Sequence, residues 1–431
     1  MEEKQKLTSS EVKTKKITSI LSIILSIVLA FAGGFFTRHF LTPSASNLTS
    51  EMIAIMEQYA YVMDSEGNLQ NFNANEYANA LITGFKDKDG YARYYTKEEY
   101  QKKKEQDKGR YVGFGITLEE GGEYPIIDNV ISNSPAEKAG LKPNDKLISA
   151  TIDGNSVQFN TVDTGEFLEG VAINKKVDFI VERNGQNQVI TVIKSRYKVD
   201  FVEYYDNEGQ VVFDFEKGTN KRVEDKKIDV DSDTSLIKID SFEGDLVYQF
   251  SKAIEYMEKN KRTKLILDLR DNGGGDVDIL LSLSRHLIYN GGKKTLIVYS
   301  EGKKENNNYY MYGPIERKSI TDVVVLANQN TASASECLIG AMLYYGEKNF
   351  TKERLILEKN DNDIEKTYGK GIMQSPFLLS SGGAFKLTTA RILWPDTKTC
   401  IHGTGITTIP ENEVNAGQDA IIRAKEILAL A

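Results

Sequence analysis

The chain has 431 residues, more than one typical domain holds, and this length predicts two or three domains. A formal net charge of −8, without a basic stripe interleaved with aromatic residues, argues against a nucleic-acid-binding protein. The only two cysteines, Cys337 and Cys400, have neither metal-ligand nor disulfide-framework spacing, and three histidines are too few for a histidine-rich metal site. We therefore expect no metal.

An uncharged segment near the N-terminus, Ile17 to Phe36, is long enough to cross a bilayer as a helix. Lys13, Lys15 and Lys16 lie immediately before it and Arg38 is the only strong cation just after it, so the N-terminus is expected in the cytoplasm. A cleaved signal peptide is the alternative, because Ala30 and Ala32 form an Ala-x-Ala pattern. The length of the apolar segment favours an uncleaved anchor with the remaining chain outside the cytoplasm.

The composition then divides the chain into further segments. A polar linker and a helical segment are expected over residues 43–107, after a tail and anchor over 1–42. Short β-branched stretches with Gly and Asn turns predict a β-rich domain over 108–197. Charged loops or a flexible hairpin are expected over 198–234. Buried-type strands alternate with helical stretches over 235–431, which indicates an α/β core ending in an amphipathic helix.

The β-rich segment carries "VGFGI", followed at a suitable distance by "VISNSPAEKAGLKPNDKLISATIDG". These two pieces together resemble a PDZ domain. The resemblance implies that the amides of Gly113, Phe114 and Gly115 receive the terminal carboxylate of a peptide. The peptide would then add as a strand to the sheet edge that Ile116 begins.

A glycine-rich turn follows an apolar strand in "KLILDLRDNGGGDVDIL", residues 264–280. A nucleotide-binding loop is one interpretation, but neither Gly-Lys-Ser/Thr nor the Gly-x-Gly-x-x-Gly spacing is present. The alternative is that backbone amides of Gly274 or Gly275 face an oxyanion, since glycine lets the bare backbone approach a substrate.

The stretch "QNTASASECLIGAM", residues 329–342, precedes an apolar helical pattern. Ser333 and Glu336 have the spacing of a capping box, which is the ordinary interpretation of such a pair. A serine at a helix N-terminus is also well placed for nucleophilic attack, because free amides and the positive end of the helix dipole favour an oxyanion. Cys337 lies on the apolar side of this helix and is expected in the core.

A third stretch, "TYGKGIMQ", places Lys370 between two glycines. Such a lysine is ordinarily an exposed turn residue with a pKa near ~10.4. Desolvation lowers that pKa, and a lysine with a lowered pKa can act as a general base. On a strand, residues 370 and 374 would share a face, so the amide of Gln374 could orient the amine.

Together these pieces, with "DKDGYARYYTKEEY", "SLIKIDSF" and "CIHGTGI", resemble the carboxyl-terminal processing (tail-specific) peptidases, a family of Ser/Lys serine proteases. The resemblance covers most of the chain beyond about residue 51 and implies a multidomain α+β protein with a crotonase-like α/β peptidase core. Ser333 would be the nucleophile, Lys370 the general base and Gln374 the residue that positions it. The amide of Ala334 and one from Gly274 or Gly275 would form the oxyanion hole. Ser335 would be a non-catalytic neighbour.

The chain departs from the family pattern in several loops. The segment between Ser333 and Lys370 is longer than usual, and its extension "KERLILEKNDNDIEK" is expected to bulge outward. The region before "SLIKI" is also expanded, and "TTIPENEV" replaces the usual Pro-Asp after "IHGTGI". A Ser-His-Asp hydrolase is the alternative chemistry, but His286 is expected on a structural helix and His402 in a structural element near the site. No Gly-x-Ser-x-Gly elbow surrounds the serine.

The sequence therefore predicts a membrane-anchored endopeptidase that cleaves exported proteins near their C-termini without a cofactor. Its partners would be protein or peptide C-termini, gathered by the PDZ domain, and the membrane; the resemblance also points to a homodimer. The alternative is a membrane-tethered PDZ adaptor with an inactive peptidase domain.

Overall fold

The computed structural model describes residues 49–50, 52–53, 74–119, 122–313, 319–346, 350–359, 366–415 and 418–430. The chain divides into two compact units, Met1–Asp87 and Lys88–Ala431. Helix α3 (Ala74–Phe85) is the main described element of the first unit. The predicted anchor, Ile17 to Phe36, lies outside the described residues. Among the residues that are described, no helix has the length and apolar character needed to cross a membrane.

The second unit begins earlier than the sequence suggests. Strand β1 (Arg93–Tyr95) pairs antiparallel with β20 (Ala384–Leu393), nearly 300 residues later in the chain. Helix α4 (Lys97–Gln106) follows, started by a capping box between Thr96 and Glu99. The segment 43–107, expected to be a linker and a helical segment, therefore also contributes a strand to a sheet of the core. The sequence did not indicate this, because strand pairing over long sequence distances leaves no local signal.

The β-rich domain is organised around an open antiparallel sheet with strand order β3-β4-β5-β7-β8, and β6 pairs with β5. Its helix α5 begins after the cap Ser134 and ends at Gly140 in the left-handed conformation, as the "SPAEKAG" pattern predicts. Strands β2 and β9 form a separate pair at its base. Its elements are β2 (Arg110–Gly113), β3 (Ile116–Glu119), β4 (Ile126–Val130), α5 (Pro135–Ala139), β5 (Lys146–Ile152), β6 (Asn155–Gln158), α6 (Thr164–Gly170), β7 (Lys176–Arg183), β8 (Gln186–Ile193) and β9 (Ser195–Lys198).

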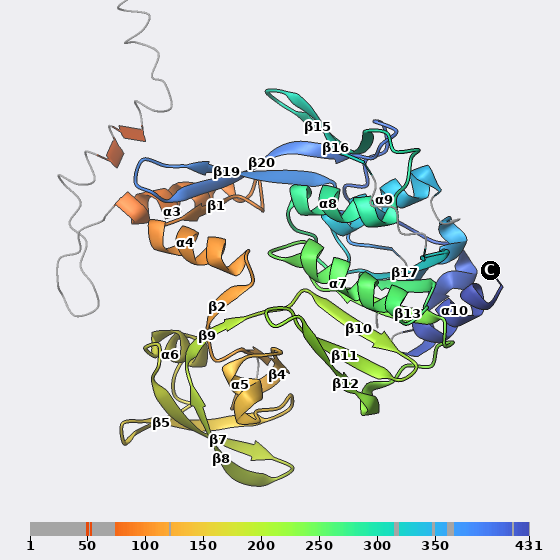
Figure 1. Cartoon of the computed structure of the whole chain (residues 1–431). Coiled ribbons are helices and arrows are strands. Elements are labelled where there is room, and N and C mark those ends of the chain that lie inside the picture. Colours follow the sequence, from red (N-terminus) through yellow and green to blue (C-terminus); the bar gives the residue numbers. More distant parts are fainter. Residues whose placement is uncertain are drawn as a thin grey trace, which may run out of the picture. The chain divides into compact units, whose positions relative to one another are not determined.

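The core contains an eight-stranded sheet, within the described residues, of order β12-β11-β10-β13-β14-β17-β18-β21 (Figure 1). Strands from β13 onwards are parallel, whereas β10 to β12 add an antiparallel edge. The elements are β10 (Val202–Asp206), β11 (Gly209–Asp214), β12 (Thr219–Val223), β13 (Thr234–Ile239), α7 (Leu246–Lys259), β14 (Lys264–Asp268), α8 (Val277–Leu287), β17 (Asp322–Asn328), α9 (Ala334–Tyr345), β18 (Leu355–Glu358), β21 (Glu413–Val414) and α10 (Gln418–Ala429).

Two expectations about this sheet need correction. Over 198–234 the expected hairpin is present as β11 and β12, but the segment is not only a connection, because β10 to β12 extend the core sheet and Tyr204 is fully buried. The extension after Ser333 does not bulge outward as a whole, because "LILE" forms the buried strand β18 between β17 and β21. Residues 360–365 of that extension lie outside the described residues. In both cases the pairing strand that buries the segment is distant in sequence.

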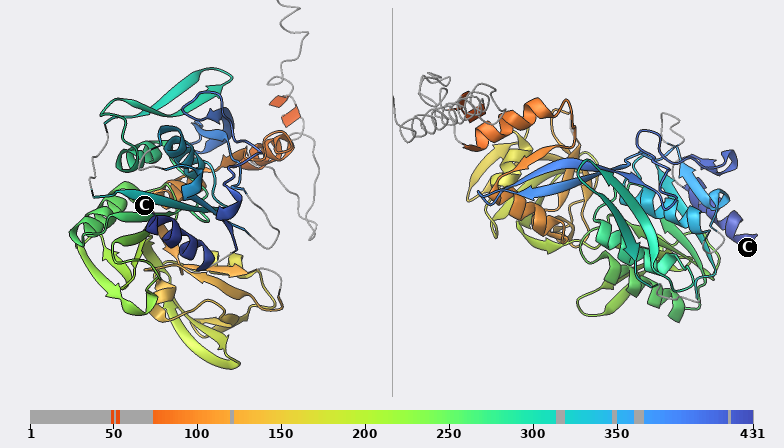
Figure 2. Two further views of the ribbon diagram at one scale, coloured as in Figure 1. Left: turned by 90° about the vertical axis from the view of Figure 1, so that its right-hand side faces the viewer. Right: turned by 90° about the horizontal axis from the view of Figure 1, so that it is seen from above.

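Alternate residues of the parallel strands contact different helices. Leu265 and Leu267 of β14 pack in one cluster with α7, α8 and α9, whereas Ile266 packs with α10 on the opposite face. Figures 1 and 2 show α10 across the sheet from α8 and α9. The amphipathic C-terminal helix was predicted, and Ala420, Ala424 and Leu428 form its buried stripe.

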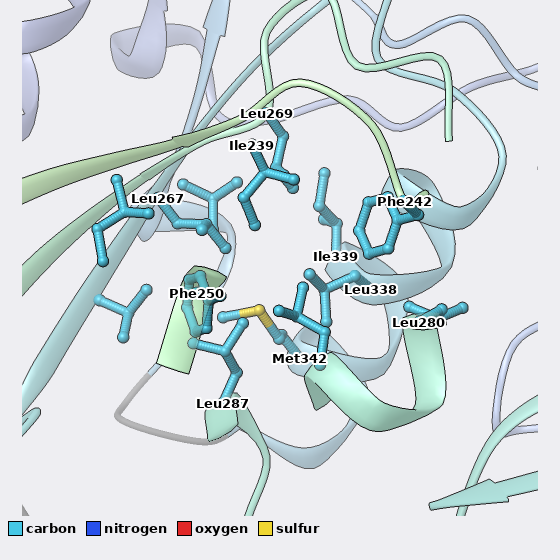
Figure 3. Close-up of a cluster of buried hydrophobic side chains, with 14 of the residues drawn as sticks. Ile239, Phe242, Phe250, Leu267, Leu269, Leu280, Leu287, Leu338, Ile339 and Met342 are labelled. Carbon is cyan, nitrogen blue, oxygen red and sulfur yellow. The ribbon is translucent and has the colours of Figure 1, made fainter. Parts of the chain in front are cut away.

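The larger cluster lies directly beneath the loops that carry the candidate site. Figure 3 shows Phe250 of α7, Leu280 of α8 and Leu338 of α9 converging with side chains from the sheet. All three are fully buried, and truncating a buried Phe or Leu to alanine typically costs about 2–5 kcal/mol. This packing fixes the N-termini of α8 and α9 relative to the ends of the strands.

A second sheet covers the other side of the candidate site. It has the order β1-β20-β15-β16, with β19 also paired to β20. Its remaining strands are β15 (Thr295–Gly302), β16 (Asn306–Met311) and β19 (Ile372–Leu378). The strand β19 continues the segment that carries Lys370, so this sheet positions the predicted base.

Candidate active site

Ser333 lies at the N-cap of α9 in an unusual backbone conformation, with φ 56° and ψ −114°. An ordinary N-cap is extended, and a positive φ at a residue with a side chain stores strain. The flanking turn is held by buried bonds: the Thr331 hydroxyl donates to the Leu269 carbonyl at 2.8 Å, and the Ala332 N–H donates to the Asn272 carbonyl at 2.9 Å. The turn therefore forces the serine into this geometry at the positive end of the helix dipole.

The glycine-rich turn after β14 lies directly against this serine. Gly274 has φ 94°, and a Cβ added there would stand 2.7 Å from the Ser333 Cβ and 2.8 Å from the Ala334 nitrogen. At Gly275, with φ 149°, a Cβ would stand 2.4 Å from the Phe242 carbonyl oxygen. Only glycine fits such close backbone contacts. The backbone of this turn therefore lies close to Ser333, as it must if one of its amides is to donate to an oxyanion.

The two glycines differ in the use of their N–H groups. The Gly274 N–H donates to Asn272 Oδ1 at 2.9 Å, and the Asn272 amide in turn donates to the Ile239 carbonyl at 2.7 Å. Asn272 is fully buried, so this pair is a fixed part of the turn. Gly274 is thereby occupied, which favours Gly275 over Gly274 as the glycine donor to an oxyanion.

Glu336 connects the serine loop with the lysine loop. Its carboxylate, fully buried, accepts the N–H of Ser333 at 2.9 Å, as expected for one half of a capping box. It also accepts the Gly369 N–H at 2.8 Å, the Lys370 N–H at 2.9 Å and the Thr367 hydroxyl. One carboxylate therefore holds both chain segments that carry the predicted dyad. The local sequence pattern indicates only the helix-capping role of Glu336.

Lys370 is half-buried rather than an exposed turn residue. Burial lowers the pKa of its amine, and the nearby Lys386 ammonium lowers this pKa further, while Glu336 opposes the shift. Its Nζ lies 4.9 Å from the centre of the Tyr91 ring. A lowered pKa is the property that a lysine base needs at neutral pH.

The glycines on either side of Lys370 are explained by the "CIHGTGI" loop. A Cβ at Gly369 would stand 2.7 Å from the Gly405 nitrogen, and a Cβ at Gly371 would stand 2.7 Å from the His402 nitrogen. His402 therefore belongs to a supporting loop, and its side chain is exposed. His286 is buried in α8 against Phe250, at 5.6 Å between ring centres. Neither histidine is among the lining residues of the candidate site, in agreement with their predicted structural roles.

Gln374 lies near the start of β19, where the ladder with β20 has an irregularity between Met373 and Gln374. Strand alternation from residue 370 to 374 does not apply, since β19 begins only at Ile372. The Gln374 amide donates to the Thr388 hydroxyl at 3.2 Å. Both Gln374 and Lys370 nevertheless line one cavity.

This cavity has a volume of about 610 Å³. Its lining includes residues from the three motifs and from the antiparallel sheet. Among them are Ser333, Gly273, Gly274, Gly275, Lys370, Ile372, Met373, Gln374, Lys386, Tyr309 and Glu243.

The neighbouring serine, Ser335, is structural, because it is buried and its hydroxyl donates to the Asn272 carbonyl at 3.1 Å. Cys337 is buried in the core, and burial raises the pKa of its thiol to about 12. Among the described residues, no cluster of His, Cys, Asp or Glu has a metal-binding arrangement.

A groove of about 950 Å³ lies next to the predicted carboxylate loop, and residues of α4 line it together with those of the β-rich domain. Gly113, Phe114, Gly115 and Ile116 line it together with Leu168 of α6. Gly115 has φ 83°, and a Cβ there would stand 2.1 Å from the Ser134 Cβ. Strand β3, which begins at Ile116, is an edge of its sheet, so its free side can receive a further strand.

Two protein families match parts of the chain. Residues 233–351 match peptidase family S41, and residues 112–193 match the PDZ domain. The chain carries an S41 peptidase core and a PDZ domain. The resemblance to carboxyl-terminal processing serine peptidases, drawn from the motifs, is thereby confirmed.

The chain is also similar to individual proteins. The chain is 27% identical over 399 residues to a protein of Staphylococcus saprophyticus named probable CtpA-like serine protease, covering 91% of this chain and 71% of that protein. It is 26% identical over 338 residues to a protein of the same name from Staphylococcus aureus, covering 78% of this chain and 60% of that protein. The solved photosystem II D1 C-terminal processing protease is similar with a TM-score of 0.46 and 18% identity, covering 89% of this chain and 97% of that chain.

Proposed function

We propose that this S41 peptidase is a membrane-anchored endopeptidase that cleaves exported proteins near their C-termini with a Ser333–Lys370 dyad. The observation that carries the proposal is the shared cavity: a strained serine at a helix N-terminus and a half-buried lysine line it together. Glu336 holds the backbone amides of both residues at 2.9 Å. The alternative, an adaptor with an inactive peptidase domain, does not explain why the serine and the lysine line one cavity and are held by one carboxylate.

The chemistry follows from the lowered pKa of the lysine. The neutral Lys370 amine takes the Ser333 hydroxyl proton while the Oγ attacks the scissile carbonyl carbon. The tetrahedral intermediate collapses, the C–N bond breaks, and the Lys370 ammonium returns the proton to the leaving amine. Lys370 then takes a proton from water, which attacks the ester, and Ser333 leaves with the returned proton. The products are two shorter chains, and the enzyme is regenerated.

The oxyanion formed in each half-reaction needs donors that are in place beforehand. The Ala334 N–H, at the first position of α9, is one such donor and gains from the helix dipole. The Gly275 N–H is the second, because the Gly274 N–H is bonded to Asn272. Losing one donor of this kind typically costs about 10²–10³ in kcat.

The PDZ domain supplies the preference for C-termini in this proposal. A free terminal carboxylate would bind the amides of the Gly113–Gly115 loop, and the preceding residues would pair with the edge strand β3. An apolar last side chain suits the pocket formed by Phe114, Ile116 and Leu168. Binding there would concentrate chains with accessible C-termini near the peptidase core.

The anchor at Ile17 to Phe36 places this reaction outside the cytoplasm. Its support is the length of the apolar segment and the lysine cluster before it. The test is the N-terminus of the mature protein isolated from membranes. A mature chain starting just after Ala32 would show a cleaved signal peptide instead.

The dyad is tested by incubating the full-length protein in detergent with an unfolded substrate protein and identifying the products by mass. Wild type is expected to cleave, whereas Ser333→Ala and Lys370→Arg are expected to be inactive and folded, since a guanidinium does not deprotonate. His402→Ala is expected to lose activity only in proportion to any lost stability. Robust cleavage by a folded Ser333→Ala or Lys370→Arg protein, with contaminating protease excluded, would contradict the dyad.

A further inference from the structure

Asp89 belongs to the motif "DKDGY" before β1, to which the proposed chemistry gives no role. Its carboxylate accepts the Thr388 N–H at 2.8 Å on Oδ2 and the Thr388 hydroxyl at 2.9 Å on Oδ1. Oδ1 also accepts the Tyr91 N–H at 3.1 Å. Although burial opposes ionisation, these bonds from Thr388 and Tyr91 hold the pKa of Asp89 below its usual range. The group is therefore an ionised carboxylate and can only accept hydrogen bonds.

This charge determines the direction of the next hydrogen bond. The Thr388 hydroxyl has one proton and gives it to Asp89, so its oxygen can only accept from a further partner. That partner is Gln374, whose Nε2 lies 3.2 Å away. The two ends of a glutamine amide are similar in shape, and their assignment follows from the hydrogen-bond network. Here the network requires the NH₂ end to face Thr388.

The opposite end of the same planar group is then the carbonyl oxygen. Gln374 lines the cavity together with Lys370, and the ladder irregularity between Met373 and Gln374 places the amide at Thr388. An amide carbonyl accepts from either the amine or the ammonium form of a lysine. An NH₂ group in that place would repel the ammonium, and it would donate to the lone pair of the neutral amine, which the base needs in order to accept the serine proton.

We propose that Asp89 is a positioning residue, which acts through Thr388 to hold the Gln374 carbonyl oxygen toward the Lys370 amine. The inference rests on the proposed Ser333–Lys370 chemistry and assigns a role to the acidic motif before β1. Asp89 contacts neither substrate nor the reacting atoms; its effect passes through two side chains of the β19–β20 hairpin.

Replacing the charge weakens the hold on this chain of hydrogen bonds. In Asp89→Asn, one acceptor oxygen becomes an NH₂ group, which must face either the Thr388 N–H or both the Thr388 hydroxyl and the Tyr91 N–H. Because either placement opposes a donor, the Thr388 hydroxyl is no longer held toward residue 89 and can give its proton to Gln374, so that the Gln374 amide can turn its NH₂ end toward Lys370. We expect kcat to fall by about 10- to 100-fold, part of the contribution of a general base, with KM changed by less than about twofold.

The Thr388 variants separate this path from a general loss of structure. Thr388→Ser keeps the hydroxyl and is expected to retain kcat within about threefold, whereas Thr388→Val removes the relay and lowers kcat about as much as Asp89→Asn. The kcat of the double variant Asp89→Asn/Thr388→Val is expected to lie within about threefold of that of the slower single variant, because both substitutions act on one path. Asp87→Asn, an exposed carboxylate two residues away, is the matched control and should equal wild type.

The readouts are kcat and KM on a peptide substrate and the thermal unfolding midpoint of each full-length protein. Multiplicative losses in the double variant, or wild-type kcat in a folded Asp89→Asn or Thr388→Val protein, would overturn the proposal. Ser333→Ala and Lys370→Arg are measured in parallel. If those two are inactive, a null result at Asp89 refutes only the positioning role; if they are active, the proposed dyad itself fails.

Discussion

Glu336 is a single buried carboxylate on which two distant loops depend. It receives hydrogen bonds from Ser333, Thr367, Gly369 and Lys370, and its side chain has no exposed surface. A buried charge is tolerated only when its lone pairs are used in this way. The same bonds that stabilise the charge set the separation of the predicted nucleophile and base.

Replacing Glu336 with Gln tests this arrangement. One of the two acceptor oxygens becomes an NH₂ group, which faces donors instead of accepting from them. We expect Glu336→Gln to lower the free energy of unfolding by about 2–4 kcal/mol and to reduce kcat strongly even when folded. Chemical denaturation and peptide cleavage measure the two effects. Glu98→Gln, at an exposed position of α4, should change stability by less than about 0.5 kcal/mol; an equally mild Glu336→Gln would contradict the interpretation.

The surroundings of Lys370, the proposed base, shift the pKa of its amine in two opposite directions. Desolvation and then the Lys386 ammonium lower the pKa of Lys370, whereas Glu336 raises it. The Nζ of Lys370 lies 4.9 Å from the centre of the Tyr91 ring, which in the proposed reaction would stabilise the ammonium formed when the serine proton arrives. These surroundings suit the role proposed for Lys370, because they favour a neutral resting amine and also support its protonated form.

The pH profile of Lys386→Gln checks the electrostatic part of this account. Activity requires the neutral amine, so kcat/KM rises as the pH rises through the pKa of Lys370. Lys386 lowers that pKa; removing its charge raises the pKa, and the acidic limb of the profile moves to higher pH. Lys259→Gln, on the exposed end of α7, should leave the limb in place. A limb that moved to lower pH, or did not move in Lys386→Gln, would refute the role of Lys386.

At the level of the elements, the turn between β14 and α8 packs closely against Ser333. Its shape comes from the Asn272 side chain, which bonds to the Ile239 carbonyl on one side and to the Gly274 N–H on the other. The Phe242 N–H donates to the Gly274 carbonyl at 2.9 Å, so a neighbouring segment completes the turn. The strand end, the turn and the start of α9 form one interlocked backbone unit.

Two adjacent glycines in this turn provide a matched pair of substitutions. Gly274→Ala would place a methyl group 2.7–2.8 Å from Ser333 and Ala334 atoms at a φ of 94°, so we expect a loss of about 1–3 kcal/mol in stability and little remaining activity. Gly273→Ala has open space around its Cβ and should retain most of both. The stability of the two variants is compared by thermal unfolding, and their activity by peptide cleavage. Equal behaviour of the two variants would mean that the turn can move away from Ser333.

At the level of the whole chain, the residues proposed to bind a C-terminus differ from those proposed to cleave the substrate. The PDZ groove and the peptidase cavity are formed by different residues, with Gly113–Ile116 in one and Ser333–Lys370 in the other. An inactive variant should therefore still bind peptides. This separation makes the recognition of a C-terminus measurable without cleavage.

The full-length Ser333→Ala protein is suited to that measurement. A labelled peptide with an apolar last residue and a free carboxylate should bind, because the Gly113–Gly115 loop offers amides to a charged acceptor. Amidating its terminus should weaken binding by at least about tenfold, since a hydrogen bond to a charged group contributes about 1.5–3 kcal/mol. The affinities of the free and the amidated peptide are measured by fluorescence anisotropy. Equal affinities would refute carboxylate recognition.

Much of the architecture could be predicted from local patterns. The capping serine and glycine of α5, the edge strand that begins at Ile116 and the apolar strands around β14 all follow from residues close together in the chain. Ser333, Lys370 and Gln374 were identified from short motifs and line one cavity. Each of these predictions uses propensity, periodicity or motif spacing, which act over a few residues.

The errors and omissions have one physical origin. Strand β1 pairs with β20, the charged segment 198–234 completes the core sheet, and β18 inserts beside β17. The pairing of such segments depends on distant hydrogen bonds and burial, which no short window of sequence contains. The four donors on Glu336 and the link from Asp89 through Thr388 to Gln374 are of the same kind. Short motifs therefore identified the candidate residues Ser333, Lys370 and Gln374, whereas the contacts formed on folding determined how these residues are buried, oriented and supported.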